Sequence, residues 1–163
     1  MQSTHHSRLA KAACAFALVT TAALLASGAS AQIPANGCQF KAADVSKALG
    51  TSFNAGQGQR GIGPSCVYTS TDGKLQLSVI MFPTTATFDA ASGVIGPAKT
   101  TQFTVVPNDA NGARIVTMAA SPNVAHVAYV RNKHLVQLRL TAAPSAMRPV
   151  ATMNSKLLAL PRV

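Results

Sequence analysis

The chain has 163 residues, of which 48% are hydrophobic, 5% are aromatic and none is Trp. This length fits one domain with its own core, built mainly from aliphatic side chains. Fourteen Lys and Arg against four Asp and no Glu give a formal net charge of +10 at pH 7, which favours contact with anionic partners. The four acids are scattered, which counts against glycosidase and divalent-metal chemistry, because both need converging carboxylates.

Residues 1–31 have the pattern of an export signal. Two basic residues and no acid precede an apolar run at 14–26, and small residues at 29–31 match the site that a signal peptidase accepts. The run is shorter than the ~20 residues of a membrane-spanning helix, and Gln32 stands where a lipid-anchored protein has its cysteine. We therefore expect cleavage near Ala31–Gln32 and a soluble periplasmic or secreted domain at 32–163.

Removal of the signal leaves two cysteines, Cys38 and Cys66. Outside the cytoplasm such a pair is expected to form a structural disulfide. The alternatives are a redox pair, whose thiols usually lie two residues apart, and a zinc site, which needs further Cys or His ligands at short spacing. The spacing and the small number of cysteines favour the structural disulfide.

The hydrophobic spacing predicts helices and strands in a clear order. A first helix is expected at 42–49, ended by Gly50, and a Gly- and Gln-rich loop at 51–64. A second helix at 84–93 and a closing helix at 149–160 complete the helices. Strands are expected at 65–69, 74–82, 102–106, 113–119, 124–131 and 134–141.

The last two strands are expected to form a hairpin around Asn132-Lys133. A two-residue turn there pairs Tyr129 with Val136 and Val127 with Leu138, and these pairs are apolar on both strands, which fixes the register. The order α-β-β-α-β-β-β-β-α predicts an α+β fold. A mainly antiparallel sheet of about five to six strands would pack with short helices on one or both faces.

Three short motifs carry a family resemblance: Cys38-Gln-Phe, the helix that ends in Leu49-Gly50, and Ser65-Cys66-Val-Tyr68. They are similar to a family of small exported bacterial cell-envelope proteins of unknown function, whose fold resembles the PsbP-like α/β sandwich. This chain differs from many members in the expected lack of a lipid anchor, and in residues 108–112, where they carry a Gly-Leu-Gly-Asp turn. The resemblance implies a fold but no activity.

Other motifs give no catalytic or cofactor site. Residues 56–61 match the letters of a dinucleotide-binding fingerprint, but no helix is expected after them, so we interpret them as a flexible loop. His126 and His134 each lie beside a cation, which suits neither a metal site nor a catalytic base. No serine lies in a Gly-x-Ser-x-Gly motif. We expect no cofactor and no metal.

The residues best placed to contact an anion are basic side chains predicted to point away from the apolar side of the sheet. The alternative for them is an ordinary solvated surface. The candidates are Lys74, Arg114, Arg131, Lys133 and Arg139.

These observations favour an exported, non-enzymatic accessory or binding domain. Its partner would be an anionic envelope polymer, lipid head groups or another protein. Nucleic acid is disfavoured, because the basic residues are dispersed and few aromatic side chains lie among them. The alternatives are an enzyme or enzyme-modulating subunit with a site built from loops, and a structural subunit of an envelope complex.

Overall fold

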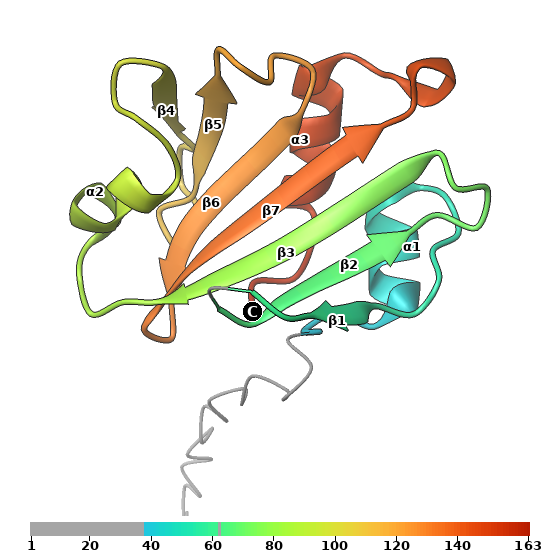
Figure 1. Ribbon diagram of the computed structural model, residues 1–163, viewed down its shortest axis with the longest axis horizontal. Coiled ribbons are helices and arrows are strands. Elements are labelled where there is room, and N and C mark those ends of the chain that lie inside the picture. Colours follow the sequence, from blue (N-terminus) through green and yellow to red (C-terminus); the bar gives the residue numbers. More distant parts are fainter. Residues whose placement is uncertain (1–37, 62) are drawn as a thin grey trace, which may run out of the picture.

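The structure is a computed structural model and describes residues 38–61 and 63–163. The export signal predicted at 1–31 lies outside the described residues. A single antiparallel sheet of seven strands, in the spatial order β1-β2-β3-β7-β6-β5-β4, dominates the fold (Figure 1). The strands are β1 (Gln57–Gln59), β2 (Ser65–Thr69), β3 (Leu75–Pro83), β4 (Thr101–Val105), β5 (Arg114–Met118), β6 (Ala125–Arg131) and β7 (His134–Ala142).

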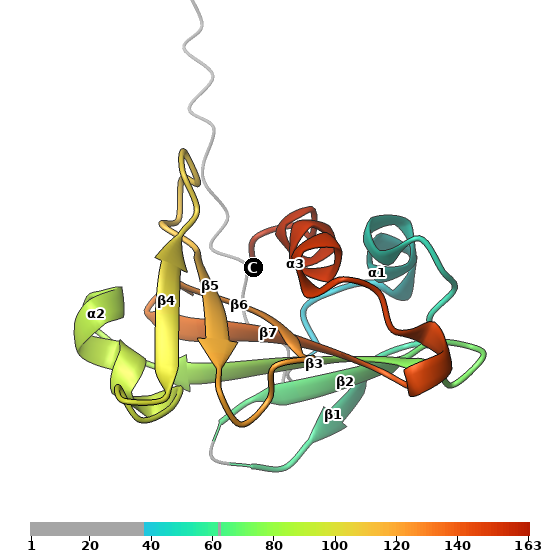
Figure 2. The same ribbon diagram turned by 90° about the horizontal axis from the view of Figure 1, so that it is seen from above.

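In the described residues, three α-helices and two short 3₁₀ turns accompany the sheet, which confirms the α+β class. Both α1 and α3 lie on one face of the sheet, as the view from above shows (Figure 2). The helical elements are α1 (Ala42–Leu49), α2 (Phe88–Ala91), η1 (Ser92–Val94), η2 (Pro144–Ala146) and α3 (Val150–Leu158).

The prediction of five to six strands was wrong, because the loop expected at 51–64 contains the edge strand β1. Its three residues, Gln-Gly-Gln, are all exposed, so no alternation of apolar and polar side chains marks them. They pair with β2, where Gly58 lies opposite Cys66, so main-chain hydrogen bonding rather than burial accounts for the strand. The described order is therefore α-β-β-β-α-β-β-β-β-α.

The helix expected at 84–93 is shorter than predicted. Its first residues form a turn in which Thr84 Oγ1 accepts a hydrogen bond from Ala86 N at 3.1 Å, while Thr84 N donates to Lys133 O. Threonine and serine hydroxyls compete in this way with helical hydrogen bonding. The α-helix therefore begins only at Phe88.

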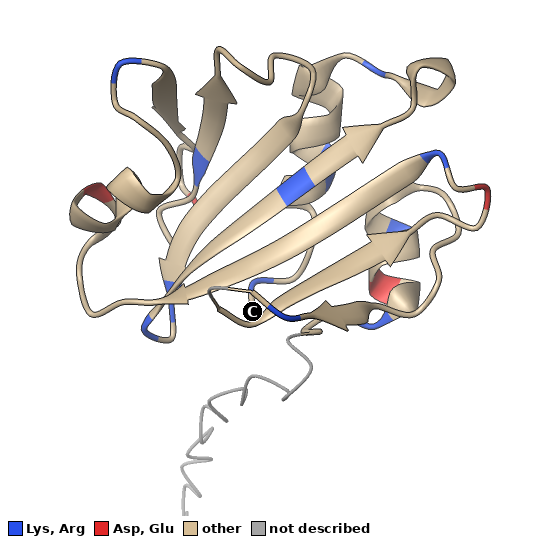
Figure 3. Cartoon of the chain, viewed as in Figure 1, with Lys and Arg blue, Asp and Glu red and all other residues tan. Residues whose placement is uncertain are grey.

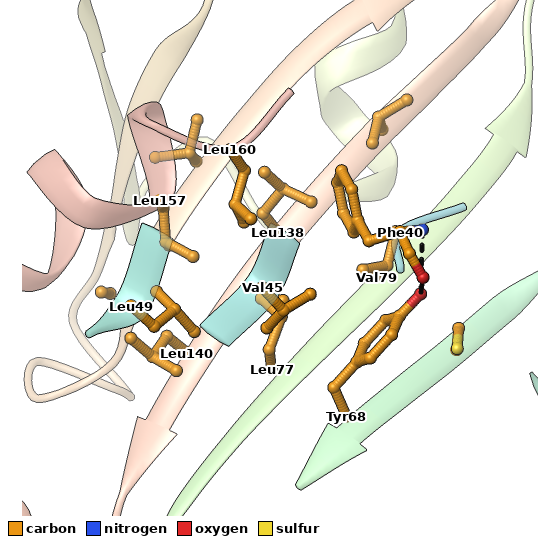
Figure 4. Close-up of a cluster of buried hydrophobic side chains, with 14 of the residues drawn as sticks. Phe40, Val45, Leu49, Tyr68, Leu77, Val79, Leu138, Leu140, Leu157 and Leu160 are labelled. Carbon is orange, nitrogen blue, oxygen red and sulfur yellow. Dashed lines mark hydrogen bonds between the residues drawn. The ribbon is translucent and has the colours of Figure 1, made fainter. Parts of the chain in front are cut away.

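The main core lies between the sheet and the two helices α1 and α3, and we call this side of the sheet the helix-covered face. Alternate residues of β3 point into it, with Leu77, Val79 and Met81 at most 1% exposed. Val45 of α1 and Leu157 of α3, both fully buried, pack onto the same cluster (Figure 4). Aliphatic side chains thus supply most of the burial, as the composition predicts.

A second, smaller cluster lies on the opposite face of the sheet, beneath α2 and η1. Phe88 of α2 packs edge-on to Phe103 of β4, with ring centroids 5.5 Å apart, and Leu135 of β7 joins the cluster. The segment between β3 and β4 therefore covers β4–β6 and the start of β7 on this face. Towards β2, Val67 and Ile80 remain partly exposed.

The amino-terminal segment is attached to β2 at two places. Cys38 and Cys66 form a disulfide in the structure, with 2.00 Å between the sulfur atoms. Tyr68 lies two residues after Cys66, on the same face of β2. Its hydroxyl accepts a hydrogen bond from Phe40 N at 3.0 Å and donates one to Phe40 O at 2.9 Å (Figure 4). The chain that enters α1 is therefore held covalently and by hydrogen bonds.

Loss of the Tyr68 hydroxyl should destabilise the fold strongly. Tyr68→Phe leaves the buried N–H and C=O of Phe40 without this partner, which costs about 1–3 kcal/mol. Urea unfolding measures the loss. The control is Tyr129→Phe, because the Tyr129 hydroxyl accepts only one longer bond, 3.4 Å from Val163 N. Equal losses of unfolding free energy in Tyr68→Phe and Tyr129→Phe would contradict the stabilising role of the Tyr68 hydroxyl.

The unreduced protein, after signal cleavage, should titrate no free thiol. Because residues 38 and 66 are 28 apart in sequence, reduction should lower the free energy of unfolding by about 3.5 kcal/mol. Thiol titration under denaturing conditions, followed by urea unfolding with and without reductant, measures both quantities. Two free thiols in the unreduced protein would contradict the disulfide.

Candidate functional site

The structure spreads the five predicted anion-contact residues over the sheet instead of gathering them (Figure 3). Lys74 precedes β3 and Lys133 follows β6, so they lie at opposite ends of the β3–β7 pair. Arg139 lies in the middle of β7, on the face away from α1 and α3, opposite Ser78 and His126 on the neighbouring strands. A single anion could not contact all of these residues.

Besides Lys74, whose Nζ lies 3.8 Å from Asp72 in an exposed ion pair, two of the five side chains are engaged within the fold. Arg131 Nη1 donates a hydrogen bond to Arg162 O at 2.6 Å. Arg114 lies over the Phe88 ring, 5.2 Å from its centroid, and donates to Gly112 O. Their partners lie far along the chain or belong to the main chain, so neither contact could be predicted from the sequence.

The contact at Arg131 is part of a larger attachment of the carboxyl-terminal residues. Arg162 pairs with Asp109 at 2.5 Å and lies over the Tyr129 ring, 5.1 Å from its centroid. Burial acts to raise the pKa of Asp109, but the Arg162 hydrogen bond and charge and two backbone amides outweigh burial and lower it. Arg131 therefore helps to hold the carboxyl-terminal residues in place.

His126 is buried, only 2% exposed, and lies beside Arg139. Burial, followed by the Arg139 charge, lowers its pKa from 6.5 to about 4, against an opposing effect of Gln137. Neither ring nitrogen has a hydrogen-bond partner among the described residues. Ser121 and His126 line a common hollow, but the space there is too narrow for a water molecule. These two side chains therefore leave no room for a substrate between them.

His126 should make the fold sensitive to mild acid. The folded protein keeps the ring neutral down to about pH 4, whereas the unfolded chain protonates it near pH 6.5, so stability is full above pH 6.5 and falls towards pH 4. The difference between the pKa of His126 in the unfolded and in the folded chain corresponds to about 3 kcal/mol in the free energy of unfolding. Urea unfolding from pH 7 to 4 should show this loss, and His126→Leu should remove most of it. The control is His134→Gln, because His134 is only partly buried. If His126→Leu loses as much stability between pH 7 and 4 as His134→Gln does, the assignment is contradicted.

A cavity of about 250 Å³ opens on the helix-covered face of the sheet. It lies where the end of α1, the start of β3, the end of β7 and helix α3 meet. Leu49, Leu75, Leu140 and Met153 form its apolar wall. These side chains continue the main core outwards, so the cavity has a hydrophobic floor.

Two cations, Arg148 and Lys156, line the same cavity. Lys156 Nζ donates one hydrogen bond to Leu49 O at 2.6 Å. This contact places positive charge at the carboxyl end of α1, where the helix dipole favours it. An ammonium group has three N–H donors, so two remain for a ligand. Arg148 is exposed and precedes α3.

Asp72, the one acidic residue that lines the cavity, already has hydrogen-bond and ion-pair partners. Asp72 accepts hydrogen bonds from Ser70 Oγ at 2.6 Å and Lys74 N at 3.1 Å, and it lies 3.8 Å from Lys74 Nζ. The Ser70 hydrogen bond is the main reason that the pKa of Asp72 is lowered. Within residues 38–61 and 63–163 the ion pairs are Lys74–Asp72 and Arg162–Asp109. Arg148 and Lys156 thus have no carboxylate partner among the described residues.

Sequence reasoning missed Arg148 and Lys156. Neither belongs to a basic cluster in the sequence, and Lys156 reaches a carbonyl 107 residues away. A partial signal existed, because Lys156 lies three residues after Met153 in the closing helix predicted at 149–160. The sequence alone does not show that α1 packs against α3, and this packing brings Arg148 and Lys156 to one cavity.

Comparison with known proteins finds no matching family model, no matching curated protein and no matching solved structure. The resemblance to exported envelope proteins with a PsbP-like fold therefore stays a prediction. No helix in the described part of the chain has the length and apolar character needed to cross a membrane. The described residues also contain no group of three or more His, Cys, Asp or Glu that could hold a metal ion.

Proposed function

We propose that this chain is an exported, non-enzymatic binding domain that holds an anionic group of a cell-envelope component in the cavity between α1 and α3. The observation that carries the proposal is the presence of Arg148 and Lys156 at a partly apolar cavity, without a carboxylate partner. A carboxylate or phosphate would accept hydrogen bonds from both side chains.

The apolar wall narrows the class of ligand. Leu75, Leu140 and Met153 can cover a short hydrocarbon portion, while the cations hold the charged group. Pockets for small ligands typically combine apolar walls with a few well-placed polar groups. The volume of about 250 Å³ suits one sugar acid of a polymer or one phosphate-containing lipid head group.

Two further observations support the envelope as the place of action. The pattern at 1–31 predicts export, and the Cys38–Cys66 disulfide suits an oxidising compartment. In addition, the +8 net charge that remains once Arg8 and Lys11 leave with the signal attracts anionic polymers and membrane surfaces from a distance. Export, the envelope ligand and the lack of catalysis are all parts of the proposal.

Binding to anionic envelope material should depend on salt and on the cavity. At low salt, the protein without its signal should bind alginate or vesicles that contain phosphatidylglycerol, but not vesicles of phosphatidylcholine alone. Binding should be lost near 0.5 M salt, because ions screen the attraction within about 4 Å. Arg148→Gln with Lys156→Gln should weaken binding about 100-fold or more, since each lost hydrogen bond to a charged group is worth about 1.5–3 kcal/mol.

The control variant removes the same charge elsewhere. Lys99 and Lys133 are both exposed and lie away from the cavity, and Lys133 has a φ of 58°, which asparagine tolerates. Lys99→Gln with Lys133→Asn should weaken binding less than 2-fold. Equal losses in the two double variants would place the contact outside the cavity, and no binding to either anionic material at low salt would overturn the proposal. Arg148→Gln alone tests the site without touching the Lys156–Leu49 hydrogen bond.

A further inference from the structure

The cavity between α1 and α3 carries charges of both signs. Arg148 and Lys156 line it, and so does Asp72, which belongs to the turn between β2 and β3. A ligand with only negative charge is attracted by the two cations but repelled by this carboxylate. The cavity therefore favours a ligand that carries a positive group as well as an anionic one.

One oxygen of Asp72 is open to such a ligand. Oδ1 accepts the hydrogen bonds from Ser70 Oγ and Lys74 N. Among the described residues, the charged neighbour of Oδ2 is Lys74 Nζ, at 3.8 Å, which is beyond hydrogen-bond distance. The side chains of Lys74 and Asp72 are 52% and 49% exposed, and exposed ion pairs are weak. A ligand N–H can therefore bind Oδ2 without breaking a hydrogen bond of the fold.

The donors on the other wall suit a phosphate group. Thr152 and Lys156 lie four residues apart in α3, so they lie on one side of the helix. Arg148 lies just before the start of α3, and all three residues line the cavity. They offer a hydroxyl, an ammonium and a guanidinium group. The oxygens of a phosphate form a tetrahedron and can accept hydrogen bonds from several directions, whereas the two oxygens of a carboxylate lie in one plane.

We propose that the ligand of this cavity is a phosphoethanolamine group, whose phosphate contacts Arg148 and Lys156 and whose primary ammonium contacts Asp72. This inference rests on the proposed function, because it names the ligand of the same site. The cations and the carboxylate come from different segments, so the two charges of the ligand must lie apart. In phosphoethanolamine two methylene groups separate them, and these can lie against Leu75 and Leu140.

Three soluble phosphodiesters that differ in one group test the inference. Glycerophosphoethanolamine carries a primary ammonium, glycerophosphocholine carries a cation without N–H donors, and glycerophosphoglycerol carries no cation. NMR titration of the protein without its signal measures the three dissociation constants and locates the residues that respond. Glycerophosphoethanolamine should bind about 10-fold more tightly than either of the others, which is the factor that one hydrogen bond to a charged group supplies.

Asp72→Asn tests the contact with the ammonium group. The variant removes the charge but keeps an oxygen that can accept the bonds from Ser70 Oγ and Lys74 N. It should weaken the binding of glycerophosphoethanolamine about 10-fold, to the level of glycerophosphoglycerol. The matched control is Asp89→Asn, because Asp89 is exposed in α2, which packs on the opposite face of the sheet. Circular dichroism verifies that both variants are folded.

The outcomes separate this inference from the proposed function. Equal affinities of the wild type for the three phosphodiesters would overturn the inference and leave the proposed function standing. Unchanged binding of glycerophosphoethanolamine in folded Asp72→Asn, or an equal loss in Asp89→Asn, would do the same. No binding of glycerophosphoethanolamine would also overturn the inference, and the proposed function would fall with it only if alginate and the anionic vesicles are not bound either.

A short-chain lipid distinguishes the two sources of a phosphoethanolamine group. Dihexanoylphosphatidylethanolamine, kept below the concentration at which it forms micelles, is titrated in the same way. Tighter binding than that of glycerophosphoethanolamine assigns the group to a membrane lipid, because Leu75 and Met153 then also cover acyl carbons. Weaker binding assigns it to a soluble or polymer-linked molecule. Both results support the phosphoethanolamine site.

Discussion

The rest of the fold depends on the attachment of residues 38–40 to β2. Helix α1 has eight residues, too few to be stable alone in water. It stays in place because its entry is held by the Cys38–Cys66 bond and by the two hydrogen bonds of Tyr68, and because Val45 and Leu49 are buried against the sheet. Without α1, the helix-covered face would lose one of its two helices. Lys156 would also lose the Leu49 carbonyl that orients its side chain.

The same attachment links stability to the proposed binding site. Leu49 contributes its side chain to the core and its carbonyl oxygen to Lys156. Gly50 ends α1 with a φ of 72°, and a Cβ placed there would lie 3.2 Å from Lys156 Nζ. The left-handed conformation and the close approach both favour glycine. The end of one short helix therefore shapes the core and the cavity together.

Elements marked by side-chain alternation or helical spacing could be predicted from the sequence. The bounds of α1, the alternation in β3 and the register of the β6–β7 hairpin follow from apolar residues on one face of each element. Strand β1 could not be found, because its three residues are exposed and only main-chain bonds to β2 define it. The cavity was missed for a related reason: Leu49, Arg148 and Lys156 meet only through the packing of α1 on α3. The positive charges of Arg131 and Arg114 could be identified in the sequence, but their contacts with Arg162 and Phe88 could not be predicted from it.

The strand order has a consequence for how the molecule is made. Strand β7 is the last in the chain, yet it lies at the centre of the sheet between β3 and β6. A chain that emerges amino terminus first, from a ribosome or a translocation channel, cannot join its two halves until residue 142 is free. Until then, β3 and β6 lack the strand that lies between them, so the complete sheet cannot form during synthesis. Such a late completion suits the export that we propose, because it delays folding until nearly all of the chain has emerged.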